Sequence, residues 1–296
     1  MKPAPICEVR AVQTRPQDRL EKRPDSLVAE LCFLKPGTQR PHSYLYEKLD
    51  GGPSQNWDPD RRTVQITEAR QLGTSIEREG FELRHVPTNM PDFEDESQIA
   101  SRYYPEVSEL ALKITGASKA YVFDHLVRRH RDDVPTLSFG RRGKGNQPGP
   151  AAETHNDYTE ESGQRRMNLV LKDSSKTLSI KRYAILNIWR SIAGPVRDAP
   201  LAVADARTVV ARDLVRTELY YPKRVGEIYL LQHSPQQTWY YFSEMDCHEA
   251  LIFKQYDSLA AGVARFTPHA AFAHPLAPPD ARKRESIEVR CLVIYE

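Results

Sequence analysis

The residues with the clearest chemical potential lie in the pentapeptide Thr154-His155-Asn156-Asp157-Tyr158. His155 and Asp157 are two positions apart, so on an extended strand their side chains point to the same side. One imidazole and one carboxylate would then converge on a single point. A second histidine from a distant strand would complete a two-histidine, one-carboxylate site, which leaves positions open on iron for a co-substrate and O₂.

A second His-x-Asp triplet, His130-Arg131-Asp132, competes with this interpretation. It lies in the segment VRRHRDD, where the neighbouring guanidinium charges would oppose the binding of a dication. We therefore interpret it as a solvated turn. His155 instead follows a loop rich in glycine and proline and precedes an aromatic residue. The alternative is that His155 and Asp157 only pair with each other or cap a turn.

A polar row marks the last predicted strand of the chain. Strand alternation places Arg284, Ser286, Glu288 and Arg290 on one face. A guanidinium binds a carboxylate through two parallel hydrogen bonds, and a nearby serine hydroxyl can add another. Arg284 and Ser286 are therefore predicted to bind a small acid. The alternative is a solvent-facing strand with alternating charge.

The second histidine ligand should come from the segment between these two motifs. Four histidines are available there: His233, His248, His269 and His274. His233 precedes a Ser-Pro-Gln-Gln loop, and His248 lies in a polar turn. His269 stands at the end of a candidate strand just before the final strand, and it is the preferred ligand. His274, in the same loop, stays open as the alternative.

The tetrapeptide Asn187-Ile188-Trp189-Arg190 is a candidate part of the substrate pocket. Asn187 and Trp189 share one strand face, whereas Arg190 takes the other face or the turn. We expect Asn187, Trp189 and Tyr158 to line a pocket over the metal, with Arg190 or Lys254 holding an acidic substrate. The alternative is that Trp189 belongs to the core and Arg190 to a surface ion pair.

The elements that position these residues are predicted to form a mainly β protein with flanking helices. We expect one domain over residues 1–296, with an N-terminal arm (1–62), a helical flank (63–120) and a β core (121–296). Helices are expected over 65–80, over 105–116 and over 208–220. Strands are expected over 28–34, 121–127, 167–171, 178–180, 183–189, 228–232, 238–242, 250–253, 262–266 and 287–294, and a loop over 138–150.

Composition excludes several classes of function. The 42 basic and 40 acidic residues nearly balance, which gives no support for a nucleic-acid partner. No apolar run reaches the length of a signal peptide or a membrane span, so no membrane partner is expected. The four cysteines are scattered and form no CxxC pair, which argues against a zinc finger. A reducing, cytoplasmic setting fits best.

Five blocks of the chain together resemble the 2-oxoglutarate oxygenase superfamily, and more narrowly the hydroxylase/desaturase family of fungal natural-product clusters. Members of that family include gibberellin desaturase and an oxygenase component of cephamycin methoxylation. The N-terminal third matches only loosely. The blocks are HNDYTEES (155–162), NIWRSIAGPVRDAPLAVAD (187–205), WYYFSEMDCHEALIFKQYDS (239–258), PHAAF (268–272) and RESIEVRCLVIY (284–295).

The resemblance implies a double-stranded β-helix, or jelly-roll, core that binds Fe(II) and uses 2-oxoglutarate as co-substrate. The PHAAF block resembles the place of the distal metal ligand, which favours His269. Arg284 and Ser286 would then bind the far carboxylate of 2-oxoglutarate. The expected reaction is hydroxylation, desaturation or oxidative cyclisation of a small molecule. Two alternatives remain: a jelly-roll metal dioxygenase that does not use 2-oxoglutarate, and a small-acid binding protein with a decayed site.

Overall fold

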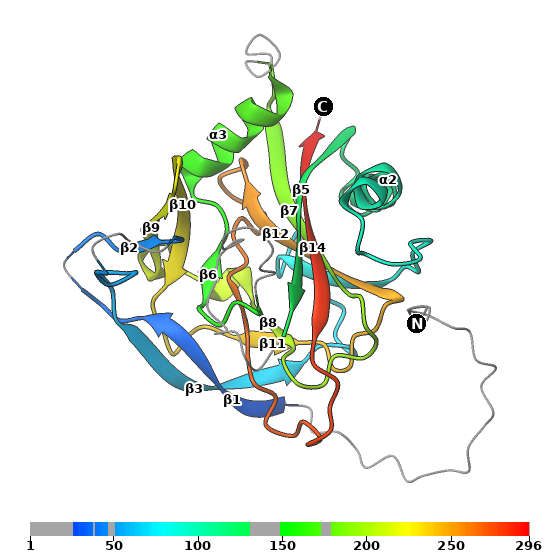
Figure 1. The fold of residues 1–296 in the computed structure, drawn as a ribbon. Coiled ribbons are helices and arrows are strands. Elements are labelled where there is room, and N and C mark those ends of the chain that lie inside the picture. Colours follow the sequence, from blue (N-terminus) through cyan, green and yellow to red (C-terminus); the bar gives the residue numbers. More distant parts are fainter. Residues whose placement is uncertain (1–25, 38, 47–50, 131–148, 173–178, 296) are drawn as a thin grey trace, which may run out of the picture.

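Two β-sheets facing each other form the body of the protein (Figure 1). A computed structural model describes residues 26–37, 39–46, 51–130, 149–172 and 179–295. The nine-stranded sheet has the order β1 (Ser26–Leu34), β3 (Pro59–Glu68), β11 (Trp239–Tyr241), β8 (Leu201–Ala204), β13 (His269–Ala271), β6 (His155–Asn156), β10 (Arg224–Leu231), β9 (Leu214–Tyr221) and β2 (His42–Tyr44). The five-stranded sheet has the order β4 (Phe81–His85), β12 (Glu249–Asp257), β7 (Arg182–Ser191), β14 (Glu285–Tyr295) and β5 (Lys119–Arg129).

The space between the sheets is filled by side chains from both. Trp189 of β7 and Phe253 of β12 belong to one buried cluster with Val203 of β8. The ring centroid of Phe253 lies 4.7 Å from that of His269 on the opposite sheet. The interior thus has the two-layer architecture of a jelly roll, and it brings strands from both sheets to the predicted site.

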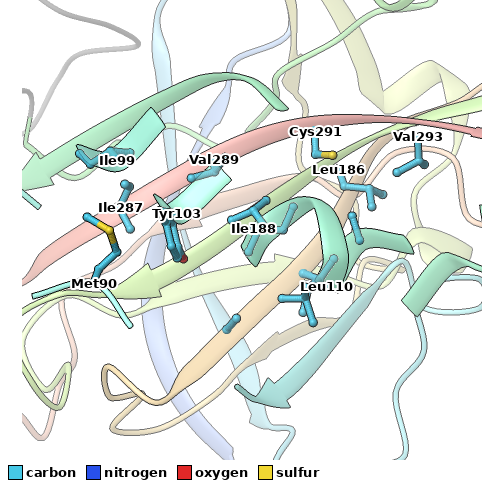
Figure 2. Close-up of a cluster of buried hydrophobic side chains, with 14 of the residues drawn as sticks. Met90, Ile99, Tyr103, Leu110, Leu186, Ile188, Ile287, Val289, Cys291 and Val293 are labelled. Atoms are coloured by element: carbon cyan, nitrogen blue, oxygen red, sulfur yellow. The ribbon is translucent and has the colours of Figure 1, made fainter. Parts of the chain in front are cut away.

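A helical layer covers the outer face of the five-stranded sheet. It consists of α1 (Glu96–Gln98), the π-helical segment η1 (Ile99–Tyr103) and α2 (Tyr104–Thr115). Figure 2 shows Tyr103 and Leu110 beside Ile188 of β7 and Val289 of β14. Each side chain that is fully buried in this way stabilises the fold by about 1.5–3 kcal/mol. The layer fixes one face of β7 and β14, so their other face is left to build the site.

The helix predicted over 105–116 is confirmed as α2. Val107, Leu110 and Ala111 are its buried residues, as the helical spacing predicts. Pro105 occupies its first turn, where a missing amide hydrogen costs nothing. Gly116 ends the helix with φ 66°, in the left-handed region that favours glycine.

Two predicted helices are wrong because β-pairing overrides the local pattern. Residues 208–220 form the short 3₁₀ segments η2 (Ala206–Thr208) and η3 (Ala211–Asp213), followed by β9, which pairs with β10 as an antiparallel hairpin. Residues 65–80 complete β3 and then turn, and β3 pairs with both β1 and β11.

Three predicted strands are also absent from the described residues. Residues 167–171 are the last turns of the helix α3 (Glu160–Leu171), which begins at a capping box between Thr159 and Ser162. Residues 262–266 form no strand, and neither do 179 and 180. Most of the predicted loop over 138–150, together with Asp132 and residue 178, lies outside the described residues.

Residues 26–62 are not a separate arm. β1 pairs with β3 along its whole length, and Leu31 and Phe33 of β1 are buried in a cluster with Ala202 and Ala270 of the nine-stranded sheet. The predicted helical flank over 63–120 also contains most of β3 and all of β4. The two regions thus contribute strands to both sheets. Within the described part of the chain, no helix is long and apolar enough to cross a membrane.

Candidate metal centre

His155, Asp157 and His269 come together between the sheets. Their candidate ligand atoms all lie within 4.8 Å of one another. His155 begins β6 and His269 begins β13, and the two residues are direct partners in the antiparallel pairing of these strands. The exposed fractions of the two histidines are only 2% and 3%. Two imidazoles and one carboxylate thus converge on one point, as expected from the sequence.

The strand that carries His155 is fixed by the N-terminal strand β1. Thr154, fully buried, donates from its backbone nitrogen to the carbonyl oxygen of Cys32 at 2.8 Å. Its hydroxyl donates to the same oxygen at 2.9 Å. These two hydrogen bonds fix the position of the residue directly before His155, the first candidate ligand.

Asp157 is oriented by two donors from the five-stranded sheet. Asn187 Nδ2 and Arg290 Nε each donate to Asp157 Oδ2 at 2.9 Å. The other oxygen, Oδ1, lies 3.4 Å from Nε2 of His155. Burial alone would raise the pKa of Asp157, but Arg290 and His155 hold it well below its usual range. The carboxylate is therefore ionised, as a metal ligand must be.

His155 turns its Nε2 atom toward Asp157, and Nδ1 of His269 lies 3.4 Å from the carbonyl oxygen of Thr267. His155 Nδ1 lies 2.7 Å from the carbonyl oxygen of Glu153, which only accepts hydrogen bonds, so Nδ1 carries the proton. Burial, followed by the proximity of His155, lowers the pKa of His269 well below its ordinary value. The lowered pKa favours the neutral imidazole of His269, which is the form that binds metals.

Gln255 of β12 links the two ligand segments, and sequence reasoning missed it. Its Oε1 accepts from the backbone nitrogen of Asp157 at 2.7 Å, and its Nε2 donates to the carbonyl oxygen of Thr267 at 3.2 Å. Gln255 lies at the irregular register between Lys254 and Tyr256. Gln255 lies just beyond the strand predicted over 250–253, so no local signal marked it.

Arg284 and Ser286 form a second buried polar site. The exposed fraction of Arg284 is 3% and that of Ser286 is 1%. One guanidinium nitrogen, NH1, donates to the carbonyl oxygen of Ala199 at 2.7 Å. Arg284 Nε and Ser286 Oγ have no hydrogen-bond partner among the described residues. Burial and the neighbouring Arg128 lower the pKa of Arg284 to about 9.

An unpaired buried guanidinium is costly unless a carboxylate joins it. Among the described residues, no carboxylate forms a side-chain ion pair with Arg284. The donor set of Arg284 and Ser286 thus fits a dicarboxylate co-substrate, and that of His155, Asp157 and His269 fits Fe(II).

Comparisons with known proteins identify the family. A profile for the family "Oxidoreductase/YMDC permease-like domain" matches residues 31–294. Hydroxylase/desaturase efuI of Hormonema carpetanum is 32% identical over 280 residues, covering 86% of this chain and 94% of that protein. The Fe(II)/2-oxoglutarate-dependent dioxygenase nvfI of Aspergillus novofumigatus is 30% identical over 286 residues, covering 90% and 95%. The chain belongs to this family of fungal Fe(II)/2-oxoglutarate-dependent oxygenases.

A solved structure agrees with the assignment. The iron and alpha-ketoglutarate-dependent endoperoxidase NvfI has a TM-score of 0.78 at 26% identity, and the match covers 92% of this oxygenase and 98% of that chain. The resemblance, the jelly-roll core and the dependence on Fe(II) and 2-oxoglutarate are thereby confirmed. These relatives use 2-oxoglutarate and are enzymes. They therefore speak against both alternatives, a dioxygenase without 2-oxoglutarate and a binding protein with a decayed site.

Three of the predicted pocket residues, Tyr158, Asn187 and Trp189, lie near the triad or near Arg284, and together they form one group. Tyr158 lines a cavity of about 300 Å³ that also borders His155 and Asp157. Asn187 contacts Asp157 directly, and Trp189 is buried between the sheets, with Arg284 lying 5.5 Å above its ring.

Arg190 is not in this group. It points into the helical layer, where its Nε donates to the hydroxyl of Tyr103 at 2.9 Å and its NH1 to the carbonyl of Cys247 at 2.5 Å. The prediction that Arg190 holds substrate is wrong, because β7 presents it to the opposite face from Trp189. Lys254 is also unsuited to that role, since its Nζ pairs with Asp257 at 2.9 Å and with Glu77 at 3.2 Å.

The other histidines lie elsewhere. His130 Nδ1 is 2.5 Å from a carboxylate oxygen of Asp198, away from the triad. His274 lies in a separate pocket with Tyr241. His233 packs its ring against Phe33, and His248 against His85.

Proposed function

We propose that this oxygenase binds Fe(II) through His155, Asp157 and His269. The observation that supports this most strongly is that their candidate ligand atoms all lie within 4.8 Å of one another. The pKa values of Asp157 and His269 are both held well below their ordinary ranges, which favours the ionised carboxylate and the neutral imidazole that a metal requires. Asn187 and Arg290 keep the carboxylate turned toward the histidines. Hydrogen-bond partners of a ligand orient it toward the metal and raise metal affinity.

We propose further that Arg284 and Ser286 bind the far carboxylate of 2-oxoglutarate. Their unpaired Nε and Oγ atoms support this role, since buried polar groups are rarely left without partners. The stacking of the guanidinium near Trp189 restrains its plane. Arg284 is thus pre-organised to form parallel hydrogen bonds with the incoming acid.

The reaction we propose is the oxidation of a small molecule in natural-product biosynthesis. Fe(II), 2-oxoglutarate and O₂ supply the oxidising power, and the chain supplies binding, orientation and protection from water. Phe253 and Trp189 are buried beside the site and exclude water from it. Tyr158 lines the cavity in which we place the substrate. The named relatives include hydroxylase/desaturases and an endoperoxidase, so hydroxylation, desaturation and oxidative cyclisation are all reactions that such a site could perform. The reducing cytoplasm, which suits an Fe(II) enzyme, is the compartment that we propose.

Turnover of 2-oxoglutarate without substrate tests the proposed ligands. The purified protein with Fe(II) and O₂ should convert 2-oxoglutarate slowly to succinate, measured by mass spectrometry. His155→Ala, Asp157→Ala and His269→Ala should each abolish this conversion, because two remaining ligands hold a labile dication too weakly. His130→Ala and His274→Ala are the matched controls and should retain it. Loss in His274→Ala with retention in His269→Ala would overturn the assignment.

A further inference from the structure

The cavity beside the triad has an excess of positive charge at its mouth. Its lining includes five arginines, Arg128, Arg165, Arg166, Arg224 and Arg290, and three carboxylates, Asp124, Asp157 and Glu227. The carboxylates are already paired. Arg290 binds both Asp157 and Asp124, and Glu227 is bound by Arg216 and Arg40, which lie outside the lining.

Three of the arginines have no such partner. No carboxylate among the described residues pairs with Arg165, Arg166 or Arg224. Arg166 lies over the ring of Phe123 at 4.9 Å, and Arg224 over the ring of Tyr221 at 3.6 Å. A guanidinium that stacks through its face still has its edge N–H groups available to donate.

Exposed apolar side chains lie beside these cations on both sides of the mouth. On α3, Leu169 is 61% exposed and shares a helix face with Arg165 and Arg166, since they are four and three residues apart. On β10, Val225 is 54% exposed and follows Arg224. Figure 1 shows α3 and β10 next to each other above β6, the strand that begins with His155. An exposed apolar patch at the rim of a cavity is typical of a ligand site.

We propose that the substrate is an amphipathic organic anion, with an oxyanion bound by Arg165, Arg166 and Arg224 and an apolar skeleton against Leu169 and Val225. This inference rests on the proposed function, because it assigns the substrate class of the same site. A carboxylate and a phosphate both match a guanidinium edge. Neither of the cations suggested by the sequence, Arg190 and Lys254, takes part, since both are paired elsewhere.

Matched probes test the charge requirement. Octanoate, octyl phosphate and octan-1-ol share one apolar chain and differ only in the head group. Ligand-observed NMR titration of the protein, loaded with Mn(II) and 2-oxoglutarate, measures their dissociation constants. We expect at least one anion to bind at least about tenfold more tightly than octan-1-ol. The tighter of octanoate and octyl phosphate identifies the oxyanion. Equal affinity for all three probes, or no binding of either anion, would overturn the proposal.

A charge-matched pair of variants locates the effect. The triple variant Arg165→Ala/Arg166→Ala/Arg224→Ala should bind the preferred anion at least about tenfold more weakly and octan-1-ol about equally. The triple variant Arg102→Ala/Arg212→Ala/Arg282→Ala removes the same charge from exposed positions outside the cavity lining and should bind like wild type. Equal losses in both triple variants would show a general charge effect and contradict the proposal.

Two further measurements, a salt titration and a competition with 2-oxoglutarate, test where and how the anion binds. Raising the NaCl concentration should weaken binding of the anion to the wild-type protein several-fold and leave octan-1-ol unaffected, without any need for a variant. In protein loaded with Mn(II) alone, displacement of the bound anion by added 2-oxoglutarate would place the anion on Arg284 instead and overturn the assignment. Absence of succinate formation by the wild-type protein would contradict the proposed function alone, because anion binding at the mouth is measured without turnover.

Discussion

Oδ2 of Asp157 accepts hydrogen bonds from Asn187 and Arg290, which leaves Oδ1 directed at His155. Because the two oxygens have different contacts, the rotation of the carboxylate is fixed before a metal binds. Arg290 also binds Glu288 at 2.9 Å, so its guanidinium is itself held in place. The polar row at the start of and along β14 therefore serves two proposed sites: Arg290 supports Asp157, the proposed metal ligand, and Arg284 lies at the position predicted for the co-substrate.

Replacing Arg290 should weaken metal binding without removing a ligand. In Arg290→Gln, Asp157 loses its charged donor and becomes free to rotate. We expect the affinity for Fe(II) to fall roughly 10–100-fold, the usual effect of removing a hydrogen-bond partner that orients a metal ligand. Anaerobic competition with a coloured chelator measures this affinity. His130→Ala is the control and should bind Fe(II) normally; an Arg290→Gln protein with wild-type affinity would show that the guanidinium has no such role.

Replacing Arg284 should affect the co-substrate and leave the metal in place. A charge-assisted hydrogen bond contributes roughly 1.5–3 kcal/mol, so Arg284→Ala should weaken 2-oxoglutarate binding at least about tenfold. Arg284→Lys should recover little, because an ammonium cannot form two parallel bonds. Calorimetric titration of the Mn(II) protein with 2-oxoglutarate gives the affinity. Unchanged affinity in Arg284→Ala would place the co-substrate elsewhere.

The sequence predicted the three residues that the structure brings together as a possible metal site, but not their supports. His155 and Asp157 are close in the chain, and strand alternation alone gives them a common direction. His269 is preferred because it follows a strand predicted over 262–266. That strand is absent, and His269 instead begins β13, which pairs with β6 at this point. Arg290 lies 133 residues from Asp157, and Gln255 lies 98 from it, so their contacts depend on how two sheets face each other. No local pattern contains that information.

At the scale of elements, a buried ionic cluster joins β7 to the end of β12. Asp257, which is fully buried, accepts from Arg182 at 3.1 and 2.7 Å and from Lys254 at 2.9 Å. Burial alone would raise the pKa of Asp257, but Arg182 and Lys254 lower it below its ordinary value. Because β12 also carries Gln255 and Phe253, this cluster helps to position the strand behind the site.

Asp257→Asn should therefore destabilise the fold by roughly 3–5 kcal/mol at neutral pH, since it leaves Lys254 buried without its nearest counter-charge. A carboxyl whose pKa is lowered on folding contributes stability above its unfolded value of about 3.9, and this contribution is lost as the pH falls through the folded value. The difference from wild type should hence be largest near pH 7 and narrow below about pH 4. Urea unfolding across this pH range measures it.

The exposed carboxylate Asp58, 78% exposed and 3.9 Å from Lys35, provides the control. Asp58→Asn should change the free energy of unfolding by less than about 0.5 kcal/mol at every pH. A pH-independent loss in Asp257→Asn would indicate a packing defect in place of the ionic contribution.

Elements with a strong local signal were predicted well, and those decided by tertiary contacts were not. α2 has apolar residues at helical spacing and a glycine stop, and it is present as predicted. β9 was predicted as a helix, but Val215, Thr217 and Leu219 alternate on one face and the hairpin with β10 satisfies its backbone. The segment Met167–Leu171 of α3 resembles a strand when it is considered alone. Its helical spacing becomes visible only together with the polar first half of the helix.

At the scale of the whole molecule, the N-terminal strand β1 is part of the core. Leu31 is 1% exposed and packs against the nine-stranded sheet, whereas Val28 on the same strand is 60% exposed. Leu31→Ala should lower the free energy of unfolding by roughly 2–5 kcal/mol, the usual cost of a core cavity. Val28→Ala should change it by less than about 0.5 kcal/mol. Chemical denaturation measures both, and equal effects would mean that β1 is a loosely attached arm.

The central claim is that the protein binds Fe(II) through His155, Asp157 and His269. It is also that the protein binds 2-oxoglutarate beside the metal through Arg284. Anaerobic titration tests it most directly, because Fe(II) bound together with the keto acid gives a weak visible charge-transfer absorption. We predict that 2-oxoglutarate added to the Fe(II) protein produces this absorption, saturating at one equivalent of metal per chain. Asp157→Ala should give none, and Arg284→Ala should reach saturation only at a much higher 2-oxoglutarate concentration. A wild-type protein that develops no such absorption, or an Asp157→Ala protein that develops it in full, would contradict the account.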